Sequence, residues 1–437
     1  MALIGAGVWR NWARNQRCAP VAVDEPRSLL EVVEAVETAA AARQTIKVVA
    51  SGHSFTDIAC TTGRMVRINA LDRILEIDRE AMTATVEAGI PLWRLNEELA
   101  KRGLALPNLG DIDRQTLAGA CATATHGTGI RYASIPQAVV GLELVSGTGE
   151  VVRCSAKEEP DAFHAARVGL GALGVMTRAT VQCEPLFRLH AVEEPKDWHS
   201  FLDEWDGIVD SNEHVDCYWY PHTETCTVKA ANRTEEPIRA RTGYKKWRAE
   251  ILYGNYYVAA TSAYGRRRPE KIPELIRGVV SGMHRTERVD LSYNVFCTPR
   301  LTRFVEMEYA IPRASMREGL TAIRALIERE HLQVDFPVEI RAIGPDDIPL
   351  SMGMGRENCY LAVHVSAGTP FERYFRGVEA IMNDLGGRPH WGKLHFQTAA
   401  TLAPRYPEWD AFQEARRRLD PDGRFRSAYT DRVLGLP

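Results

Sequence analysis

The segment Lys47-Val-Val-Ala-Ser-Gly-His-Ser54 constrains the fold more than any other stretch of this chain. Apolar and β-branched residues lead into a Ser-Gly turn, which predicts a buried strand that ends where glycine can adopt any φ angle. The backbone N–H groups of such a turn can approach an anionic ligand closely. For His53 the simplest alternative is an ordinary surface histidine at the end of a strand.

A second segment, Leu117 to Gly129, consists almost entirely of small residues around His126, and Gly110 and Asp111 precede it. Side chains this small offer too little apolar area to build an ordinary core. We therefore expect a flat, bulky ligand to lie against this backbone.

Length and charge limit the class of protein. A chain of 437 residues should form two or three domains. Its net charge of -3, with acids and bases mixed throughout, does not favour nucleic acid or an anionic membrane as the main partner. We expect the arginine clusters at residues 266–268 and 416–418 to be solvated surface.

Nine scattered cysteines form no zinc-site spacing and indicate free thiols in a reducing compartment, so we expect no metal. Neither a secretory signal nor a run of transmembrane length is visible, which favours a cytoplasmic protein. The aromatic-rich stretch Ile251 to Tyr264 is predicted to be core, with a weak interfacial patch as the alternative.

Helices, strands and turns alternate without a strict βαβ rhythm, which predicts an α+β fold. Gly169-Leu-Gly-Ala-Leu-Gly174 spells a dinucleotide-binding fingerprint, but a helix is predicted before it, over 161–168, and a strand after it, over 175–183. The fingerprint requires the reverse order. We therefore reject a Rossmann turn and keep a close backbone contact with a ligand as an alternative.

Three features of the second half could carry chemistry. Glu339 and Arg341 lie two apart on a predicted strand and so share one face, as a surface ion pair or, given the apolar flanks, as a buried functional pair. Lys393 lies between His390 and His395, without an acidic or thiol partner at metal-ligand spacing. His364 lies in the middle of a predicted strand, where a core histidine is the default.

Four motifs occur together in the order typical of one family: Ala50-Ser-Gly-His-Ser54, the run from Ala118 to Gly129, Glu339-x-Arg341, and His390-Trp-Gly-Lys393. Over nearly its whole length the chain resembles the sugar-1,4-lactone oxidases of the vanillyl-alcohol-oxidase flavoprotein superfamily, especially the L-gulono-1,4-lactone oxidases. Alditol oxidases are close relatives of that family.

The resemblance implies a two-part FAD-binding domain over residues 1–187, an α+β cap domain over 188–388, and a carboxy-terminal segment, 389–437, that completes the active site. It implies FAD linked covalently through His53 alone, since Cys121 does not occupy the place of a second link. The implied cofactor-binding residues are Ala50, Ser51, Gly52, His53, Ser54, Gly110, Asp111, Gly119, Thr123, Thr125, His126, Gly127, Gly174 and Val175.

The implied reaction is oxidation of a sugar 1,4-lactone at the carbon next to the carbonyl, giving an ascorbate-type product. Arg341 would bind substrate oxygens, and Glu339 would orient Arg341 or accept a hydrogen bond from a substrate hydroxyl. Lys393 would stabilise the negative charge on the developing alkoxide or the reduced flavin. His364 is a candidate proton acceptor beside Ala362, where alditol oxidases carry a histidine.

The electron acceptor implied by Gly110 is O2, which would yield hydrogen peroxide, because an alanine at this place is associated with dehydrogenases. A lactone or alditol dehydrogenase that passes electrons to a cytochrome or quinone, an alditol oxidase, and a non-catalytic sugar-binding relative are the alternatives. The preferred lactone and the oligomeric state are not determined by the sequence.

Overall fold

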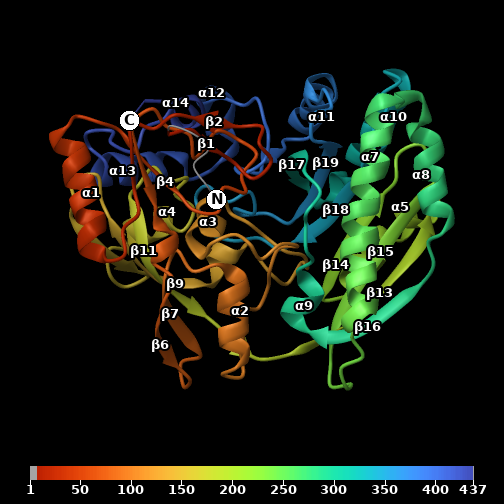
Figure 1. Ribbon diagram of the computed structural model, residues 1–437, viewed down its shortest axis with the longest axis horizontal. Coiled ribbons are helices and arrows are strands. Elements are labelled where there is room, and N and C mark those ends of the chain that lie inside the picture. The colour runs from red at the N-terminus through yellow and green to blue at the C-terminus, as the bar shows by residue number, and fades with distance from the viewer. Residues whose placement is uncertain (1–6, 437) are drawn as a thin grey trace.

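The computed structural model describes residues 7–436, which form two lobes side by side (Figure 1). The first lobe contains a three-stranded parallel sheet in the order β3 (Ala22–Asp24), β5 (Arg64–Arg67), β4 (Ile46–Val49). Helix α1 (Leu29–Ala41) connects β3 to β4, and its buried face packs on this sheet through Val32 and Val36. Ser28 caps the amino terminus of α1 by accepting a hydrogen bond from the backbone of Glu31.

A five-stranded antiparallel sheet forms the rest of the first lobe. Its order is β10 (Val151–Ser155), β9 (Val139–Val145), β11 (Val175–Gln182), β7 (Thr83–Glu87), β6 (Ile74–Asp78). The alternating burial of β11 shows that one of its faces packs on the core. Helices α2 (Leu92–Ala100), α3 (Leu117–Ala122) and α4 (Pro160–Ala166) belong to the same lobe, as do the short pairs β1 (Trp9–Arg10) with β2 (Arg17–Cys18) and β8 (Leu104–Ala105) with β12 (Glu184–Pro185).

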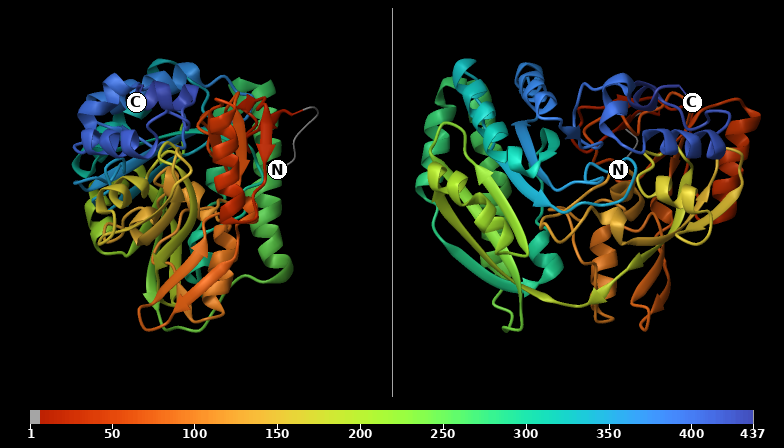
Figure 2. Two further views of the ribbon diagram at one scale, coloured as in Figure 1. Left: turned by 90° about the vertical axis from the view of Figure 1, so that its left-hand side faces the viewer. Right: turned by 180° about the vertical axis from the view of Figure 1, so that it is seen from behind.

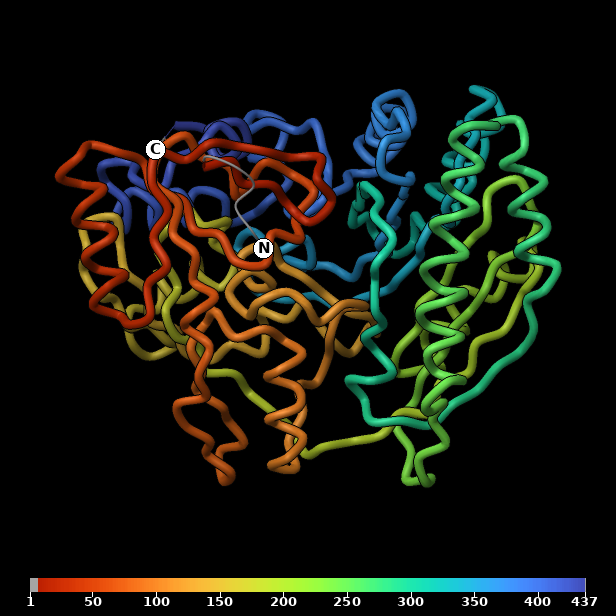
Figure 3. The backbone as a smooth tube through the Cα atoms, in the orientation of Figure 1, coloured from red at the N-terminus to blue at the C-terminus, as the bar shows by residue number. Residues whose placement is uncertain are grey.

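The second lobe is built on an eight-stranded sheet, which the chain enters between β12 and β13 (yellow-green in Figure 3). Its order is β16 (Thr286–Leu291), β13 (Arg188–Asp197), β15 (Thr225–Thr234), β14 (His214–Trp219), β18 (Val338–Ile343), β19 (Asn358–Ser366), β17 (Phe304–Pro312), β20 (Arg388–Pro389).

One face of this large sheet is apolar and covered by α5 (Trp198–Asp210), α10 (Met316–Arg329) and α11 (Glu372–Asp384). Trp205, Leu320 and Phe375 of these helices pack with Cys217 and Ile340 of the strands in one core. The opposite face carries the polar side chains of the candidate site.

The remaining helices divide between the lobes (Figure 2). Helices α6 (Gly243–Trp247), a π-helical segment (Arg248–Tyr257) and α7 (Val258–Arg267) follow one another directly, and α8 (Ile272–Ser281) and α9 (Ser292–Phe296) come next. The carboxy-terminal helices α12 (Ala399–Leu402), α13 (Trp409–Leu419) and α14 (Ala428–Leu434) return to the first lobe (blue in Figure 1). Among residues 7–436 no helix has both the length and the apolarity needed to cross a bilayer.

Two expectations from the sequence were wrong. Arg416 is not solvated: it is 1% exposed and donates to the carbonyl oxygen of Gly435 at 2.9 Å, because α13 packs this side chain under the carboxy terminus. The stretch Ile251 to Tyr264 is not core throughout, because only one face of the helix packs on the protein. Tyr253 and Tyr256 on its other face are 55% and 58% exposed.

Candidate active site and cofactor cleft

Strand register brings the candidate catalytic residues together on one face of the large sheet. Tyr218 of β14 pairs with Glu339 of β18, and Glu339 pairs in turn with Ala362 of β19. On the neighbouring strand pair, His364 of β19 lies opposite Glu306 of β17. Because paired residues on adjacent strands project on the same face, these polar side chains form rows across the sheet.

Glu339 and Arg341 form a buried ion pair, 5% and 6% exposed, with Arg341 donating to Glu339 at 2.5 Å. Arg341 also donates to Asp216 at 3.1 Å, and the hydroxyl of Tyr218 donates to Glu339 at 2.6 Å. Burial raises the pKa of Glu339 to about 8 against the attraction of Arg341, with Asp216 adding to the rise. The pair is therefore buried and is not a surface ion pair.

Lys393 and His364 share a carboxylate, Glu306. Lys393 donates to one oxygen of Glu306, and the Nε2 of His364 lies 3.5 Å from the other. Burial lowers the pKa values of Lys393 and His364, but Glu306 and the other nearby acids together outweigh burial and raise both pKa values. The Nδ1 of His364 lies 3.2 Å from the carbonyl oxygen of Pro337, and since a carbonyl only accepts, Nδ1 carries a hydrogen. Lys393 is therefore held as a cation at neutral pH, and Glu306 favours the protonated form of His364.

The chain segment after β20 carries Lys393 to this place. The backbone of His390 donates to Glu308 and that of Leu394 donates to Glu306, so residues 390–394 run along the edge of β17. The segment also meets the His53 turn, where Phe55 donates to the carbonyl oxygen of Gly392 at 2.7 Å. Site residues from both lobes thus meet here.

The His53 turn follows β4, as expected, and has Gly52 at φ +66°. The amino-terminal segment holds it: the backbone of Trp12 donates to Gly52 at 2.8 Å, and the indole ring of Trp12 stacks on His53 with centroids 5.6 Å apart. Burial and Lys393 lower the pKa of His53 to about 4. The imidazole is therefore neutral at physiological pH, with its nitrogen lone pair free of a proton.

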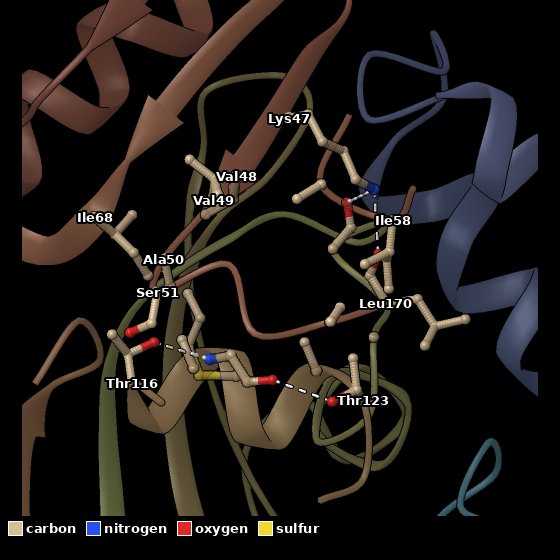
Figure 4. Close-up of a pocket in the computed structure, with 18 of the residues that line it drawn as sticks. Lys47, Val48, Val49, Ala50, Ser51, Ile58, Ile68, Thr116, Thr123 and Leu170 are labelled. Carbon is tan, nitrogen blue, oxygen red and sulfur yellow. Dashed lines mark hydrogen bonds between the residues drawn. The ribbon is translucent and has the colours of Figure 1, made fainter. Parts of the chain in front are cut away.

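A cleft with a volume of about 130 Å³ runs along the small-residue segments (Figure 4). Its walls come from β4 and the turn after it, from α3 and from the turn before β11, together with side chains such as Trp9, Ile58 and Met176. The nitrogen of Lys47 reaches across to donate to the carbonyl oxygens of Leu170 and Gly171, at 3.2 and 3.1 Å. Thr116 caps α3 by accepting from Gly119.

The cleft continues into a larger cavity of about 390 Å³ beneath the large sheet, since His53, Ser54, Gln115 and Thr123 line both. The cleft fits an elongated group that needs close backbone approach. Gly174, at φ +149°, has no room for a side chain, because a Cβ there would lie 2.7 Å from the carbonyl oxygen of Val145 in β9.

All four candidate catalytic residues, Glu339, Arg341, Lys393 and His364, line the larger cavity. Of the candidate cofactor residues, eight line the cleft: Ala50, Ser51, Gly52, His53, Ser54, Gly119, Thr123 and Gly174. Asp111 lines the larger cavity, and a small neighbouring cavity is lined by Gly110 and Gly127.

Thr125, His126 and Val175 line none of these cavities. Val175 lies in an apolar core at 0% exposure because β11 turns it inward. His126 lies beneath the site, its Nε2 3.2 Å from Glu308, and its Nδ1 donates to the carbonyl oxygen of Gly127 at 3.1 Å.

His126, Glu308 and His390 are close enough to hold a metal ion, as are Glu306, Glu339 and His364. In the first group the backbone of Gly392 donates to Nδ1 of His390, which leaves the hydrogen of the neutral ring on Nε2. That ring offers no free lone pair while the hydrogen bond lasts. In the second group, Glu306 accepts a hydrogen bond from Lys393 and Glu339 accepts one from Arg341, so both carboxylates already have cationic partners.

Sequence reasoning missed several residues of the site. Glu306 is the most important, and the pattern Glu306-x-Glu308 within an apolar strand, which places two acids on one face, could have revealed it. Asp216-x-Tyr218 carries the same signal on β14. Arg300, which lines the larger cavity and donates to Asp111 at 3.2 Å, was also missed. Like Lys47 and Trp12 it gave no comparable signal, because its contact is distant in sequence.

The fold and the site define an FAD-binding oxidoreductase. A model of the FAD-binding domain matches residues 20–155. The solvent-stable cholesterol oxidase shares the fold with a TM-score of 0.83 at 20% identity, covering 99% of this chain and 98% of that one. Cholesterol oxidase from B. sterolicum aligns with a TM-score of 0.79 at 19% identity, over 98% and 96% of the two chains. The prediction of an α+β, vanillyl-alcohol-oxidase-type fold is confirmed.

The chain belongs to the D-arabinono-1,4-lactone oxidase family, whose model matches residues 179–433. It is 44% identical to L-gulono-1,4-lactone dehydrogenase of Mycobacterium tuberculosis, over 98% of this chain and 99% of the relative. It is 34% identical to L-gulonolactone oxidase of Mus musculus, over 98% of both chains. The family predicted from the four motifs is confirmed.

Proposed function

We propose that this protein oxidises a sugar 1,4-lactone, L-gulono-1,4-lactone or a close relative, at the carbon next to the carbonyl, and passes the electrons to O2. The observation that carries the proposal is the cavity that His53 shares with Arg341, Glu339 and Lys393. The names of the relatives support the substrate class. FAD, when bound, supplies the acceptor for a hydride from the alcohol carbon.

Arg341 binds and orients the substrate. Its guanidinium is fixed by Asp216 and Glu339, so its remaining donors point in a defined direction without a further cost in side-chain entropy. Lys393, held as a cation by Glu306, stabilises the negative charge that develops on the alcohol oxygen as its proton leaves.

Glu339 is the proton acceptor in this proposal. A general base works best when its pKa lies near the working pH, and the pKa of Glu339, at about 8, meets that condition. The Nε2 of His364 lies 3.5 Å from Glu306, so in this proposal His364 keeps Glu306 and Lys393 in place.

His53 carries a covalent link to FAD in this proposal. The neutral imidazole, packed between Trp12 and the wall of the cavity, has the lone pair that such a bond requires. The predicted cofactor residues that line the cavities keep that role here, and Lys47, Thr116, Leu170 and Gly171 join them because they line the cleft. Thr125, His126 and Val175 lie outside these cavities. The division of the chain at 187/188 and 388/389, and a cytoplasmic location, stay predictions.

A lactone dehydrogenase is the second candidate, favoured by the name of the relative with 44% identity. Gly110 supports the oxidase. A Cβ there would lie only 3.2 Å from the carbonyl oxygen of His126, so a methyl group would reduce the free space beside Gly110.

The test is an anaerobic titration of the purified flavoprotein with L-gulono-1,4-lactone, watched at the oxidised-flavin band, followed by admission of air. Bleaching with rapid return of colour in air is expected. Bleaching that persists in air would replace the oxidase with the dehydrogenase, and no bleaching with any lactone would refute the proposed substrate class.

A further inference from the structure

The helical segment from α6 through α7 exposes an aromatic face that nothing in the proposed reaction explains. All six exposed aromatic residues of the described chain lie on it: Tyr244, Trp247, Tyr253, Tyr256, Tyr257 and Tyr264. They range from 46% exposed at Trp247 to 69% at Tyr244. Aromatic side chains are expensive to leave in water, so their concentration on one helix marks an interaction surface.

The same helix has a second, buried face toward the active site. Gly254, Asn255, Val258, Thr261 and Ser262 line the larger cavity that contains Glu339 and Lys393. The helix therefore covers the cavity with one side, while its aromatic residues are exposed on the other. The helix itself runs along the outside of the second lobe, where α7 is labelled in Figure 1. The outer face is not needed to close the cavity.

Asn255 fixes the helix to the loop before β17. Its amide donates to the carbonyl oxygen of Pro299 at 3.0 Å and accepts from the backbone of Leu301 at 2.6 Å. It lies at the end of the π-helical segment, where it also donates to the carbonyl oxygen of Glu250. These bonds orient the helix, so its aromatic side chains project outward together.

Positive charge accompanies the aromatic residues. Residues 243–268 contain six lysines and arginines and a single glutamate, whereas the whole chain has a net charge of -3. The six are exposed and make no ion pair with the described part of the chain: Lys245, Lys246, Arg248, Arg266, Arg267 and Arg268. Glu250, the one acid, is turned toward Arg288 at 3.9 Å.

We propose that this aromatic–basic helix binds the surface of an anionic lipid bilayer. Tyrosine and tryptophan suit the headgroup region, because each has an apolar ring and a polar group that can stay hydrated. Flanking lysines and arginines add attraction to anionic headgroups. A second copy of the chain fits poorly, since two such positively charged faces would repel each other.

The test is sedimentation of the flavin-loaded protein with vesicles of phosphatidylglycerol and phosphatidylcholine in equal amounts, at low and high salt. We expect binding at low salt that weakens as salt screens the charges, and little binding to phosphatidylcholine alone. Equal binding to both vesicle types, or no binding at low salt, would overturn the proposal.

Two variants assign the binding to this face. Lys245→Glu with Lys246→Glu should weaken binding about tenfold or more, and Tyr253→Ser with Tyr256→Ser and Tyr257→Ser should weaken it by a similar factor. Matched controls change exposed residues elsewhere: Arg27→Glu with Lys157→Glu for charge, and Leu30→Ser with Leu75→Ser for apolar area. The controls should bind as the parent protein does.

Bound flavin and melting temperature, measured on each variant, confirm that it folds. Sedimentation velocity tests the alternative of self-association. If the parent forms a dimer that the tyrosine variants dissociate, and the parent does not bind vesicles, the face is a dimer interface and the proposal is overturned. Brominated lipids give a direct readout, since they should quench the fluorescence of the parent more than that of Trp247→Phe.

Discussion

At the scale of single residues, the site depends on unequal pairing between acids and bases. Arg341 faces two carboxylates, Asp216 and Glu339, whereas Glu306 faces two basic side chains, Lys393 and His364. Because Asp216 and Glu339 share one arginine, Arg341 neutralises only part of their negative charge. Burial therefore raises the pKa of Glu339. This imbalance is what gives Glu339 a pKa suited to proton transfer.

The role of Glu339 predicts a pH dependence. Anaerobic flavin reduction by the lactone, followed by stopped flow, should accelerate as pH rises through about 8, because the carboxylate is the accepting form. Glu339→Gln should be slow and lose this dependence, while the exposed control Glu414→Gln keeps it. An unchanged profile in Glu339→Gln would remove Glu339 as the base.

The same shift affects stability in a defined direction. Since the folded-state pKa lies above the ordinary 4.5, the contribution of Glu339 to stability is fully present below about pH 4.5 and is lost as pH rises to about 8. Over this window, Glu339→Gln should flatten the fall in melting temperature. A parent-like fall in the variant would contradict the raised pKa.

Lys393→Met should slow flavin reduction by about 100-fold, the effect of losing one electrostatic stabiliser of a developing oxyanion. FAD retention should hardly change, because Lys393 lines the larger cavity and not the cleft proposed to hold the cofactor. Stopped-flow reduction and flavin content per protein separate the two quantities. Reduction at the parental rate would exclude Lys393 from the reaction.

His53→Ala should release flavin when the protein is denatured with acid, because no covalent link remains. The parent, and His199→Ala as a control for loss of an exposed histidine, should keep the colour in the pellet. Flavin that stays with denatured His53→Ala would show that the link lies elsewhere.

At the scale of elements, the cofactor cleft depends on a contact between β4 and the turn that precedes β11. Lys47 is 1% exposed, and burial lowers its pKa to about 7, yet its nitrogen holds two carbonyl oxygens of that turn. Leu170 and Gly171 both have positive φ angles there. The turn needs this external support because few residues tolerate such a backbone.

Lys47→Met should therefore weaken FAD binding by about tenfold, the loss of one to two hydrogen bonds, without lowering the stability of the apoprotein. The comparison is best made in the His53→Ala background, where flavin can dissociate and be titrated back. Lys157→Met, an exposed lysine, is the control. Equal FAD affinity of His53→Ala with and without Lys47→Met would show that the turn keeps its conformation without Lys47.

At the scale of the whole molecule, β13 holds together two strands, β15 and β16, that are separated in sequence by residues 235–285. It pairs with β15 on one side and with β16 on the other, and the exposed residues 235–242 lie between these two strands in sequence. A cut in that loop should leave both fragments hydrogen-bonded to the same sheet. Brief trypsin treatment, which can cleave after Arg239 or Arg241, should give nicked protein that still elutes as one species with its flavin. Separation of the fragments would contradict this.

The sequence by itself determined the local elements and the family. The strand into the His53 turn, the small-residue run, and the order of helix, glycine turn and strand around Gly169 to Gly174 depend on neighbouring residues, and the structure has each as predicted. The pair Glu339 and Arg341 shares a face because side chains on a strand alternate with a period of two.

Only the tertiary structure decided what these residues face. Lys393 meets Glu306 across 87 positions and Arg341 meets Asp216 across 125, because the strand order β14-β18-β19-β17 is not the order of the sequence. Burial of Arg416 and exposure of the tyrosines on the π-helical segment and α7 were likewise unpredictable from composition, since the same helix can turn either face to a partner. Pairing between distant strands and packing of a helix face depend on the whole chain, and so does the pKa of every group in the site.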